Sequence, residues 1–363
     1  MLKKTDQKST APFSENLLKW YDANARPMPW RVAPSQSVKG IYMNPYYTWL
    51  SEVMLQQTQV VTVKEYFLKF KSKWPSVHDL AATDLEDVLK AWAGLGYYSR
   101  ARNLKKCAEQ IVLEHNGRFP ETVDALIKLP GIGNYTASAI SSIAFGKNVA
   151  VVDGNVERVI TRQYCIDTPI KTAKPKVHAI TQSLLSNERP GDFAQAMMDL
   201  GATLCSPKNP KCDLCPVSKN CQAFAKGTMQ NYPVKEPKKA KPVRKGAAFV
   251  LINNECQIFL EKRLEKGLLA GMSQVPTTDW NSNKNGEVGI ASAPKLAGQL
   301  KWQSHAPIRH TFTHFHLDLE VWSAECSTNK AEDLEGWWCD EARLKDEALP
   351  TVFMKVIKSA LKA

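Results

Sequence analysis

The sequence contains no long hydrophobic run. No segment approaches the roughly 18 to 20 consecutive apolar residues that span a bilayer, and Met1–Asp6 leads into no apolar core of an export signal. The sequence has no internal repeat, and no low-complexity tract lies outside residues 226–245. We therefore expect a soluble protein that is not exported.

Acidic residues are scarce relative to basic ones. The chain has 36 Asp and Glu against 48 Lys and Arg, which gives a net charge of +12 and a pI of about 9.2. A polyanion is a natural partner for such a chain, although a solvated basic surface explains the charge equally well. A hydrophobic content of 44% and a charged content of 23% argue against wholesale disorder. At 363 residues the chain is expected to form two domains.

The pattern of apolar residues changes along the chain. Over residues 13–224 they recur at spacings of three and four, which is typical of helices, and Thr83-Asp84-Leu85-Glu86 is interpreted as a capping box. Residues 226–245 hold seven basic residues, one acidic residue and three prolines, a composition typical of a linker. Beyond this segment apolar residues alternate in short runs, as over 315–322, which indicates strands. We therefore predict a helical domain over 1–225, a basic linker over 226–245 and a mixed α/β domain over 246–363.

Four of the nine cysteines are clustered. Cys205, Cys212, Cys215 and Cys221 have the spacing C-x6-C-x2-C-x5-C, and prolines among them prevent a regular helix. Four thiolates so close together suit either a zinc ion or an iron-sulfur cluster, and the spacing does not distinguish the two. A set of reduced, buried cysteines is the plainer alternative.

A glycine-containing turn joins two predicted helices. Leu129-Pro130-Gly131-Ile132-Gly133 lies between a helix that ends near Lys128 and one that begins near Asn134. The glycines Gly131 and Gly133 permit close backbone approach, and the amides of the second helix then form a phosphate site without reading base sequence. An ordinary turn between helices is an equally good interpretation.

Two carboxylates are candidates for chemistry. Asp153 follows an apolar run and is placed to cap a helix, where backbone amides favour its ionised form. Glu52 lies among strongly apolar neighbours, which would favour the protonated form and a role as general acid. For each there is a plainer interpretation, a simple helix cap for Asp153 and a solvent-exposed helix face for Glu52.

Six ordered motifs together resemble the adenine DNA glycosylase (MutY) family of the helix-hairpin-helix DNA glycosylase superfamily. They are Pro29-Trp30-Arg31, Ser51 to Thr58 (Ser-Glu-Val-Met-Leu-Gln-Gln-Thr), Gly94-Leu95-Gly96-Tyr97-Tyr98, Leu129 to Gly133, Val152 to Val156 (Val-Asp-Gly-Asn-Val) and the cysteine spacing. The resemblance implies removal of adenine mispaired with 8-oxoguanine or guanine, leaving an abasic site. It also implies a [4Fe-4S] cluster on the four cysteines.

The resemblance implies catalytic roles for four residues. Glu52 is expected to protonate the flipped adenine, and Asp153 to face the oxocarbenium-like sugar. Tyr135 and Asn155 are expected to assist around the sugar. Endonuclease III-type relatives carry a lysine at the position of Tyr135, and because tyrosine forms no Schiff base we expect a monofunctional enzyme.

The resemblance also implies residues that hold DNA. Gln57 and Tyr97 match wedge positions that fill the gap left by the extruded base, while Arg31 and Leu55 match residues that line the adenine pocket. For Leu55 and Tyr97, core packing is the plainer interpretation. The expected partner is double-stranded DNA with A:8-oxoG or A:G mispairs, bound by a monomer in the cytoplasm, at the nucleoid of a bacterium.

Residues 246–363 resemble the C-terminal domain of the family, which has the fold of the Nudix hydrolases. They contain no Nudix box, so recognition of 8-oxoguanine is the expected role, through Phe312, Thr313 and His314. The family usually has serine at the position of Thr313. Two further departures are Gly271–Pro276, which lacks the usual Trp-Glu-Phe, and an insertion between Arg31 and Pro45.

Three other functions fit parts of the sequence. A catalytically inactive iron-sulfur DNA-binding protein of the same fold is disfavoured by the presence of both Glu52 and Asp153. A glycosylase-lyase is disfavoured by Tyr135, and a Nudix-type nucleotide hydrolase by the missing box.

Overall fold

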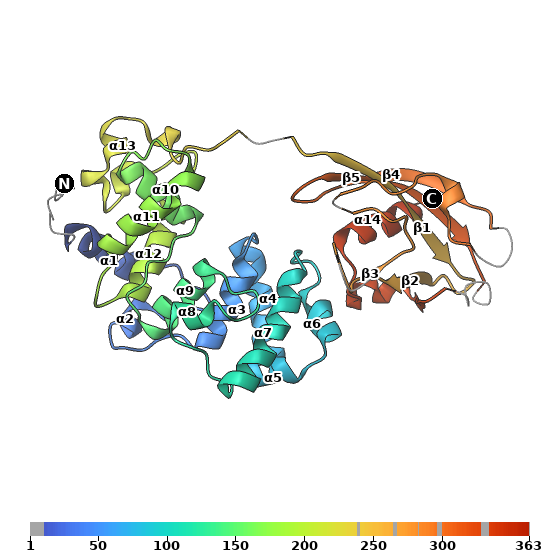
Figure 1. Cartoon of the computed structure of the whole chain (residues 1–363), viewed down its shortest axis with the longest axis horizontal. Coiled ribbons are helices and arrows are strands. Elements are labelled where there is room, and N and C mark those ends of the chain that lie inside the picture. Colours follow the sequence, from blue (N-terminus) through green and yellow to red (C-terminus); the bar gives the residue numbers. More distant parts are fainter. Residues whose placement is uncertain are drawn as a thin grey trace. The chain divides into compact units, whose positions relative to one another are not determined.

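The computed structural model describes residues 11–237, 240–263, 267–281, 283–295, 300–327 and 334–362. The chain forms two compact units (Figure 1). The first comprises the residues up to Ala82 together with Asn103–Pro237, and the second comprises Thr83–Arg102 together with the residues from Lys238 onward. The described residues include no helix of the length and hydrophobicity that crossing a membrane requires.

The first unit is helical, as the spacing of its apolar residues predicts. Its helices, with α7 beginning in the second unit, are α1 (Ala11–Asn24), α2 (Pro34–Ser37), α3 (Pro45–Leu55), α4 (Val60–Lys73), α5 (Val77–Ala82), α7 (Ser99–His115), α8 (Val123–Leu126), α9 (Asn134–Phe145), α10 (Gly154–Gln163), α11 (Ile170–Leu184), α12 (Pro190–Thr203) and α13 (Gln222–Ala225). Short 3₁₀ turns lie at Cys212–Leu214, Ser218–Asn220 and Met229–Asn231.

Local chemistry sets the ends of the helices that carry the site. Helix α3 begins at Pro45, and the side chain of Asn44 accepts a hydrogen bond from the Tyr46 amide. Helix α9 ends at Gly146, whose φ of 63° is the left-handed conformation that glycine adopts without strain. Helix α10 is capped by Asp153, as predicted.

Helix α12 forms the centre of the first unit. All twelve residues of Pro190–Gly201 are buried, and the helix packs against α1, α9 and α10. A helix that is buried all round fixes its side chains by close packing. It therefore supplies a rigid base for any polar side chain that it directs into a cavity.

The expected capping box at Thr83 is wrong. Helix α6 (Leu85–Trp92) begins after Asp84, whose side chain makes no capping hydrogen bond. The carboxylate of Glu86 pairs instead with Lys90 at 2.9 Å, one turn further along the helix. The helix itself lies where the sequence predicts it.

The second unit contains a mixed sheet. Its strands are β1 (Val243–Ile252), β2 (Ile258–Lys262), β3 (Ser273–Gln274), β4 (Gln303–Thr311), β5 (His316–Glu325) and β6 (Trp337–Cys339). Their order is β3-β2-β1-β5-β4, with β6 paired to β2; the β1–β5 pairing is parallel and the other pairings are antiparallel. Helix α14 (Thr351–Ala360) packs on β4, β5 and β1.

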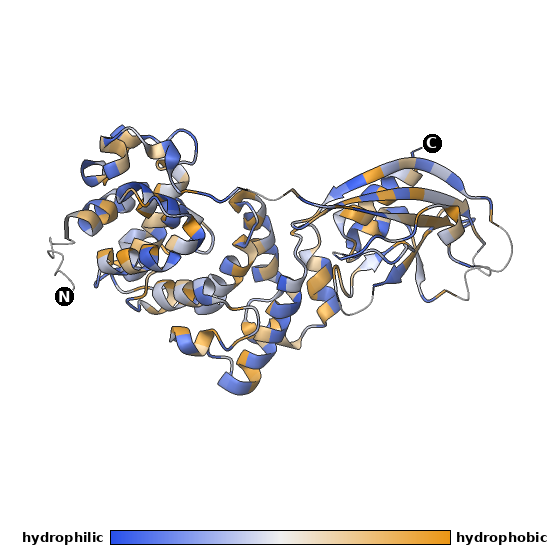
Figure 2. Cartoon of the chain, turned by 45° about the horizontal axis from the view of Figure 1, so that its top comes forward, coloured by the Kyte–Doolittle hydropathy of each residue, from blue (hydrophilic) through white to orange (hydrophobic). Residues whose placement is uncertain are grey.

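Side chains on β5 alternate between the two faces of the sheet. Leu317, Leu319 and Val321 are buried, and the residues between them are partly exposed. Figure 2 displays the same alternation of hydrophobic and hydrophilic residues along the strands of this unit. The predicted helical N-terminal region and mixed α/β C-terminal region are both confirmed.

Candidate functional site

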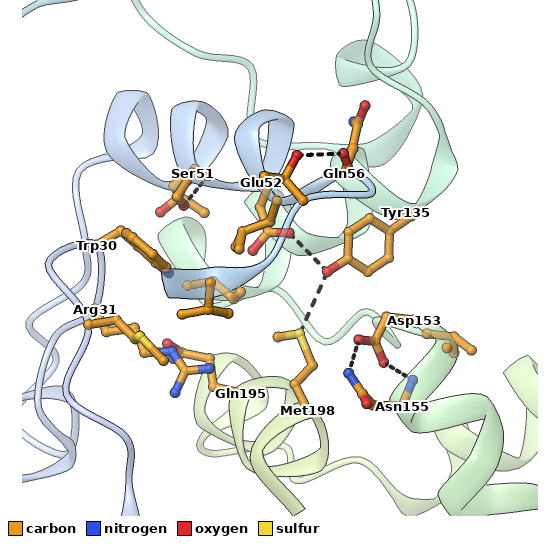
Figure 3. Close-up of a pocket in the computed structure, with 18 of the residues that line it drawn as sticks. Trp30, Arg31, Ser51, Glu52, Gln56, Tyr135, Asp153, Asn155, Gln195 and Met198 are labelled. Atoms are coloured by element: carbon orange, nitrogen blue, oxygen red, sulfur yellow. Dashed lines mark hydrogen bonds between the residues drawn. The ribbon is translucent and has the colours of Figure 1, made fainter. Parts of the chain in front are cut away.

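A cavity of about 790 Å³ lies within the first unit. Its walls come from α3, α9, α10 and α12, from the segment between α1 and α2, and from the residues that follow α3 (Figure 3). Seven of the residues that the sequence singles out line this cavity: Arg31, Glu52, Leu55, Gln57, Tyr135, Asp153 and Asn155. The structure therefore brings together side chains that are separated by more than one hundred positions in the sequence.

Glu52 is buried at the cavity wall. Its side chain lies on α3 with a residue exposure of 5%, so the alternative interpretation of a solvent-exposed helix face is wrong. Periodicity misleads here because α3 is buried from Tyr46 to Met54 with few gaps. Burial raises the pKa of Glu52 to about 7, and nearby Asp153 adds to the rise, whereas the Tyr135 hydroxyl and Arg31 oppose it.

Tyr135 lies beside Glu52, in the first turn of α9. Its hydroxyl donates to Oε2 of Glu52 at 2.9 Å and contacts Sδ of Met198 at 3.6 Å. Burial raises the pKa of Tyr135 well above its usual range, and the neighbouring carboxylates act in the same direction. The phenol therefore stays protonated and serves as a hydrogen-bond donor.

Asp153 holds the N-terminus of α10. Its Oδ1 accepts hydrogen bonds from the amides of Asn155 and Val156, both at 2.8 Å, and its Oδ2 accepts one from Nδ2 of Asn155 at 2.8 Å. These donors and the positive end of the helix dipole favour a carboxylate at this place. Figure 3 places Asp153 and Asn155 across the cavity from Glu52.

A chain of hydrogen bonds links Asp153 to the segment that carries the clustered cysteines. Oδ1 of Asn155 accepts from Nη2 of Arg158 at 2.8 Å, and Nε of Arg158 donates to the carbonyl of Cys205 at 2.7 Å. Gly201 makes room for this arrangement, because a Cβ atom there would lie 2.5 Å from Cβ of Asn155.

The predicted hairpin joins α8 to α9. Gly131 has a φ of 74°, and a Cβ atom there would lie 2.7 Å from Cβ of Asn103. Ile132 is buried and anchors the turn, whereas Gly131 and Gly133 are exposed. The amides at the start of α9 thus face a surface that a phosphate can approach.

The four clustered cysteines line one pocket. Cys205, Cys212, Cys215 and Cys221 all border it, and Nη1 of Arg162 lies 3.3 Å from Sγ of Cys205. Within the described ranges, no three His, Cys, Asp or Glu side chains meet the geometry of a single-ion site.

In the second unit, Phe312, Thr313 and His314 lie between β4 and β5, and we call them the β4–β5 loop. The Phe312 ring stacks on Phe315 with centroids 4.9 Å apart, and Nζ of Lys241 donates to the Phe312 carbonyl at 2.8 Å. Thr313 Oγ1 lies 2.8 Å from the hydroxyl of Tyr97, which belongs to the same unit. Tyr97 has a φ of 49° and is 45% exposed, so it is not a core residue.

Two family models and several curated proteins match this chain. Residues 50–185 match the HhH-GPD superfamily of base excision DNA repair proteins, and residues 247–359 match the NUDIX domain. The adenine DNA glycosylase of Homo sapiens is 35% identical over 373 residues, which cover 87% of this chain and 67% of the human protein. That of Buchnera aphidicola subsp. Schizaphis graminum is 33% identical over 352 residues, which cover 95% of this chain and 98% of the relative. The chain belongs to the adenine DNA glycosylase family.

A solved structure agrees with this assignment. A thermostable thymine-DNA glycosylase is 29% identical, with a TM-score of 0.53 over 60% of this chain and 97% of that protein. The chain is thus a DNA glycosylase of base excision repair, and DNA is its substrate. The matches do not favour the alternative of an inactive DNA-binding protein. The exact domain boundaries of 1–225, 226–245 and 246–363 stay a prediction.

A buried ion-pair network beside the cavity of this glycosylase was not predicted from the sequence. Asp199 on α12 has no exposed side-chain surface and binds Nε of Arg26 at 2.7 Å and Nη1 of Arg31 at 2.8 Å. Burial alone would raise the pKa of Asp199, but Arg31 and Arg26 outweigh it and lower that pKa. An aspartate inside the apolar run Phe193–Leu200 was the available signal, because such a charge needs a partner.

Gln195 and Met198 on α12, together with Gln56 after α3, also line the cavity without having been predicted. The insertion between Arg31 and Pro45 forms α2 and folds back toward α12. There the Ser37 hydroxyl donates to Oδ2 of Asp192 at 2.5 Å.

Proposed function

We propose that this protein hydrolyses the N-glycosidic bond of adenine mispaired with 8-oxoguanine or guanine and leaves an abasic site. The observation that carries the proposal is the pairing of two unlike carboxyl groups in one cavity. Glu52 is buried with a raised pKa, whereas Asp153 accepts three hydrogen bonds. Two carboxyl groups in such different surroundings can divide the roles of acid and anion.

Glu52 acts as the general acid. It gives its proton to a ring nitrogen of the extruded adenine, so that the base leaves with the electron pair of the broken bond. With a pKa of about 7, a substantial fraction of Glu52 is protonated near neutral pH. Such help typically contributes about 10²- to 10⁴-fold to the rate.

Asp153 stabilises the positive charge that develops on the sugar as the bond breaks. Its carboxylate is held in place by the amides of α10 and by Asn155, so little reorganisation is needed in the transition state. A water molecule then adds to the sugar carbon and loses a proton to the Glu52 carboxylate, which restores the acid and gives the abasic site.

Tyr135 makes the enzyme monofunctional. A phenol cannot form the Schiff base through which an amine at this position would lead to strand cleavage. Its hydroxyl donates to Glu52 instead, which orients the acid towards the cavity. We therefore expect strand breaks only after alkali treatment of the abasic product.

Other residues place the nucleotide. The cavity volume of about 790 Å³ accommodates a purine nucleoside, and Arg31 and Leu55 would contact its adenine base. Gln57 and Tyr97 have positive φ values and would enter the gap left by the extruded base. The exposed turn at Gly131 and Gly133 would hold a phosphate of the same strand.

The β4–β5 loop would identify the opposite base. Phe312 is packed, whereas Thr313 and His314 are exposed. The Thr313 hydroxyl, which lies 2.8 Å from the Tyr97 hydroxyl, and the imidazole of His314 would contact the edge of 8-oxoguanine. Threonine retains the hydroxyl group of the serine that is usual in the family.

We assign a [4Fe-4S] cluster to Cys205, Cys212, Cys215 and Cys221. All four thiols line one pocket, as a cluster of several iron atoms requires, and Arg162 offers an N–H group to Cys205. When bound, the cluster would cross-link residues 205–221 and thereby fix the carbonyl of Cys205 that Arg158 binds. We further propose that the protein works as a monomer at a bacterial nucleoid; the similarity to the Buchnera protein supports only the bacterial setting.

The proposal is tested with duplexes that differ in one base pair. Adenine is placed opposite 8-oxoguanine, guanine or thymine, and strand breaks are measured with and without alkali under single-turnover conditions. The expected order of rates is 8-oxoguanine, then guanine, with no cleavage opposite thymine and few breaks without alkali. Equal rates opposite thymine and 8-oxoguanine would contradict the proposed specificity.

A further inference from the structure

The turn between α6 and α7 has an unusual backbone. Gly94, Gly96 and Tyr97 all have positive φ values, of 100°, 69° and 49°. Glycine adopts this region freely, but a tyrosine does so at a cost in energy. The exposed side chain that the proposed function uses as a wedge therefore sits on a conformation that other contacts must hold.

Arg100 supplies such contacts from the first turn of α7. Its Nη2 donates to the carbonyls of Leu95 and Gly96, at 3.1 and 3.2 Å. Its guanidinium also lies over two rings, 5.1 Å from the centroid of Trp92 and 5.6 Å from that of Tyr97. One side chain thus binds the backbone on the N-terminal side of Tyr97 and faces the Tyr97 ring.

The guanidinium of Arg100 is buried, so its contacts replace bonds to water. Arg100 is only 8% exposed, and burial lowers the pKa of its guanidinium to about 10. A buried cation is stable only where carbonyls or aromatic faces replace the lost water, and this turn provides both. Trp92 strengthens the arrangement, because its Nε1 donates to the same Gly96 carbonyl at 3.1 Å.

We propose that Arg100 is a positioning residue that holds Tyr97 ready to enter the DNA helix. The side chain fixes the left-handed turn, so Tyr97 loses little conformational freedom when it fills the gap left by the extruded base. Lysine cannot replace it, because a compact ammonium lacks the flat guanidinium face that lies over the rings of Trp92 and Tyr97. This inference rests on the proposed function, in which Tyr97 is a wedge.

The test combines Arg100→Lys with Tyr97→Ala in the full-length protein. The DNA probe is a duplex with adenine opposite 8-oxoguanine and with 2-aminopurine beside the 8-oxoguanine, because 2-aminopurine fluoresces more when it is unstacked. Fluorescence on binding and single-turnover adenine release are both measured. Arg100→Lys is expected to slow the fluorescence rise and adenine release about 10-fold, since small displacements of positioned groups have effects of this size or more. In the Tyr97→Ala background the same change should alter both rates less than about 2-fold.

Lys105→Gln is the matched control. Lys105 is another buried cation of α7 that binds a carbonyl, that of Ala81, but it does not touch the turn. Its substitution should leave both rates within about 2-fold of the parent. If Arg100→Lys does not fold, Trp92→Phe replaces it, because this change removes the bond to the Gly96 carbonyl and part of the aromatic face under the Arg100 guanidinium. It should then slow both rates in the parent, and neither in the Tyr97→Ala background.

Two results would overturn the inference. In the first, Arg100→Lys shows the same rates of fluorescence rise and adenine release as an active parent. In the second, Arg100→Lys slows both rates by the same factor in the parent and in the Tyr97→Ala background. If neither the parent nor Lys105→Gln releases adenine or unstacks the probe, the proposed function itself fails, and the inference fails with it.

Discussion

The hydroxyl of Tyr135 lies 2.9 Å from Oε2 of Glu52 and joins the start of α9 to α3. Burial raises the pKa of Glu52 to about 7, and this hydrogen bond keeps it from rising further. Because the acid must be protonated to act, adenine release should fall as the pH rises through about 7.

Tyr135→Phe should move that fall to higher pH. Without the hydroxyl, the Glu52 anion loses a donor and its pKa rises. The measurement is the single-turnover rate of adenine release between about pH 5 and 9. Met198→Leu serves as the control, since Met198 contacts the Tyr135 hydroxyl but not Glu52. A Tyr135→Phe profile that matches the parent, or that moves to lower pH, contradicts this account.

Glu52→Gln should stabilise the fold at high pH. The pKa of Glu52 is higher in the folded protein than its usual value of 4.5, so folding favours the protonated carboxyl. This contribution to the free energy of unfolding is fully present at low pH and is lost as the pH rises through about 7. At 1.36 kcal/mol per pKa unit, the gain at pH 9 should approach about 3 kcal/mol and should vanish near pH 4. Urea unfolding at the two pH values measures it. A pH-independent effect of Glu52→Gln would rule out a buried, titrating carboxyl.

Asp199→Asn should destabilise the protein. Asp199 is fully buried between Arg26 and Arg31, and its neutralisation leaves two cations without their counter-charge. Breaking a buried ion pair typically costs about 3 to 5 kcal/mol. Asp22→Asn is the control, because Asp22 pairs with Arg189 at an exposed site and should cost less than about 1 kcal/mol. Equal losses in the two variants would show that the Asp199 network contributes no more than a surface pair.

Thr313→Val should weaken the preference for 8-oxoguanine over guanine. Valine keeps the shape of threonine and removes the hydroxyl that the β4–β5 loop would offer to the base. We expect the ratio of the two rates to fall about 10-fold, whereas Thr313→Ser should keep it within about 3-fold. An unchanged ratio in Thr313→Val would mean that another group distinguishes the two bases.

Much of the site follows from the sequence because its signals are local. The cap at Asp153 depends on amides two and three residues away, and the turn at Gly131 depends on its own backbone. The burial of Glu52 could not be predicted by periodicity, since α3 is covered on nearly all sides by other elements. The bonds between Asp199 and the arginines Arg26 and Arg31 could not be predicted either, because the partners are 173 and 168 positions apart in the sequence.

The most direct test of the account is the release of free adenine by the parent and by Glu52→Gln from a duplex with adenine opposite 8-oxoguanine. Single-turnover release is followed by chromatography, with binding to the same duplex measured in parallel. With Glu52 as the general acid, Glu52→Gln is expected to bind the duplex with similar affinity and to release adenine at least about 100-fold more slowly. Release by Glu52→Gln at the rate of the parent would contradict it.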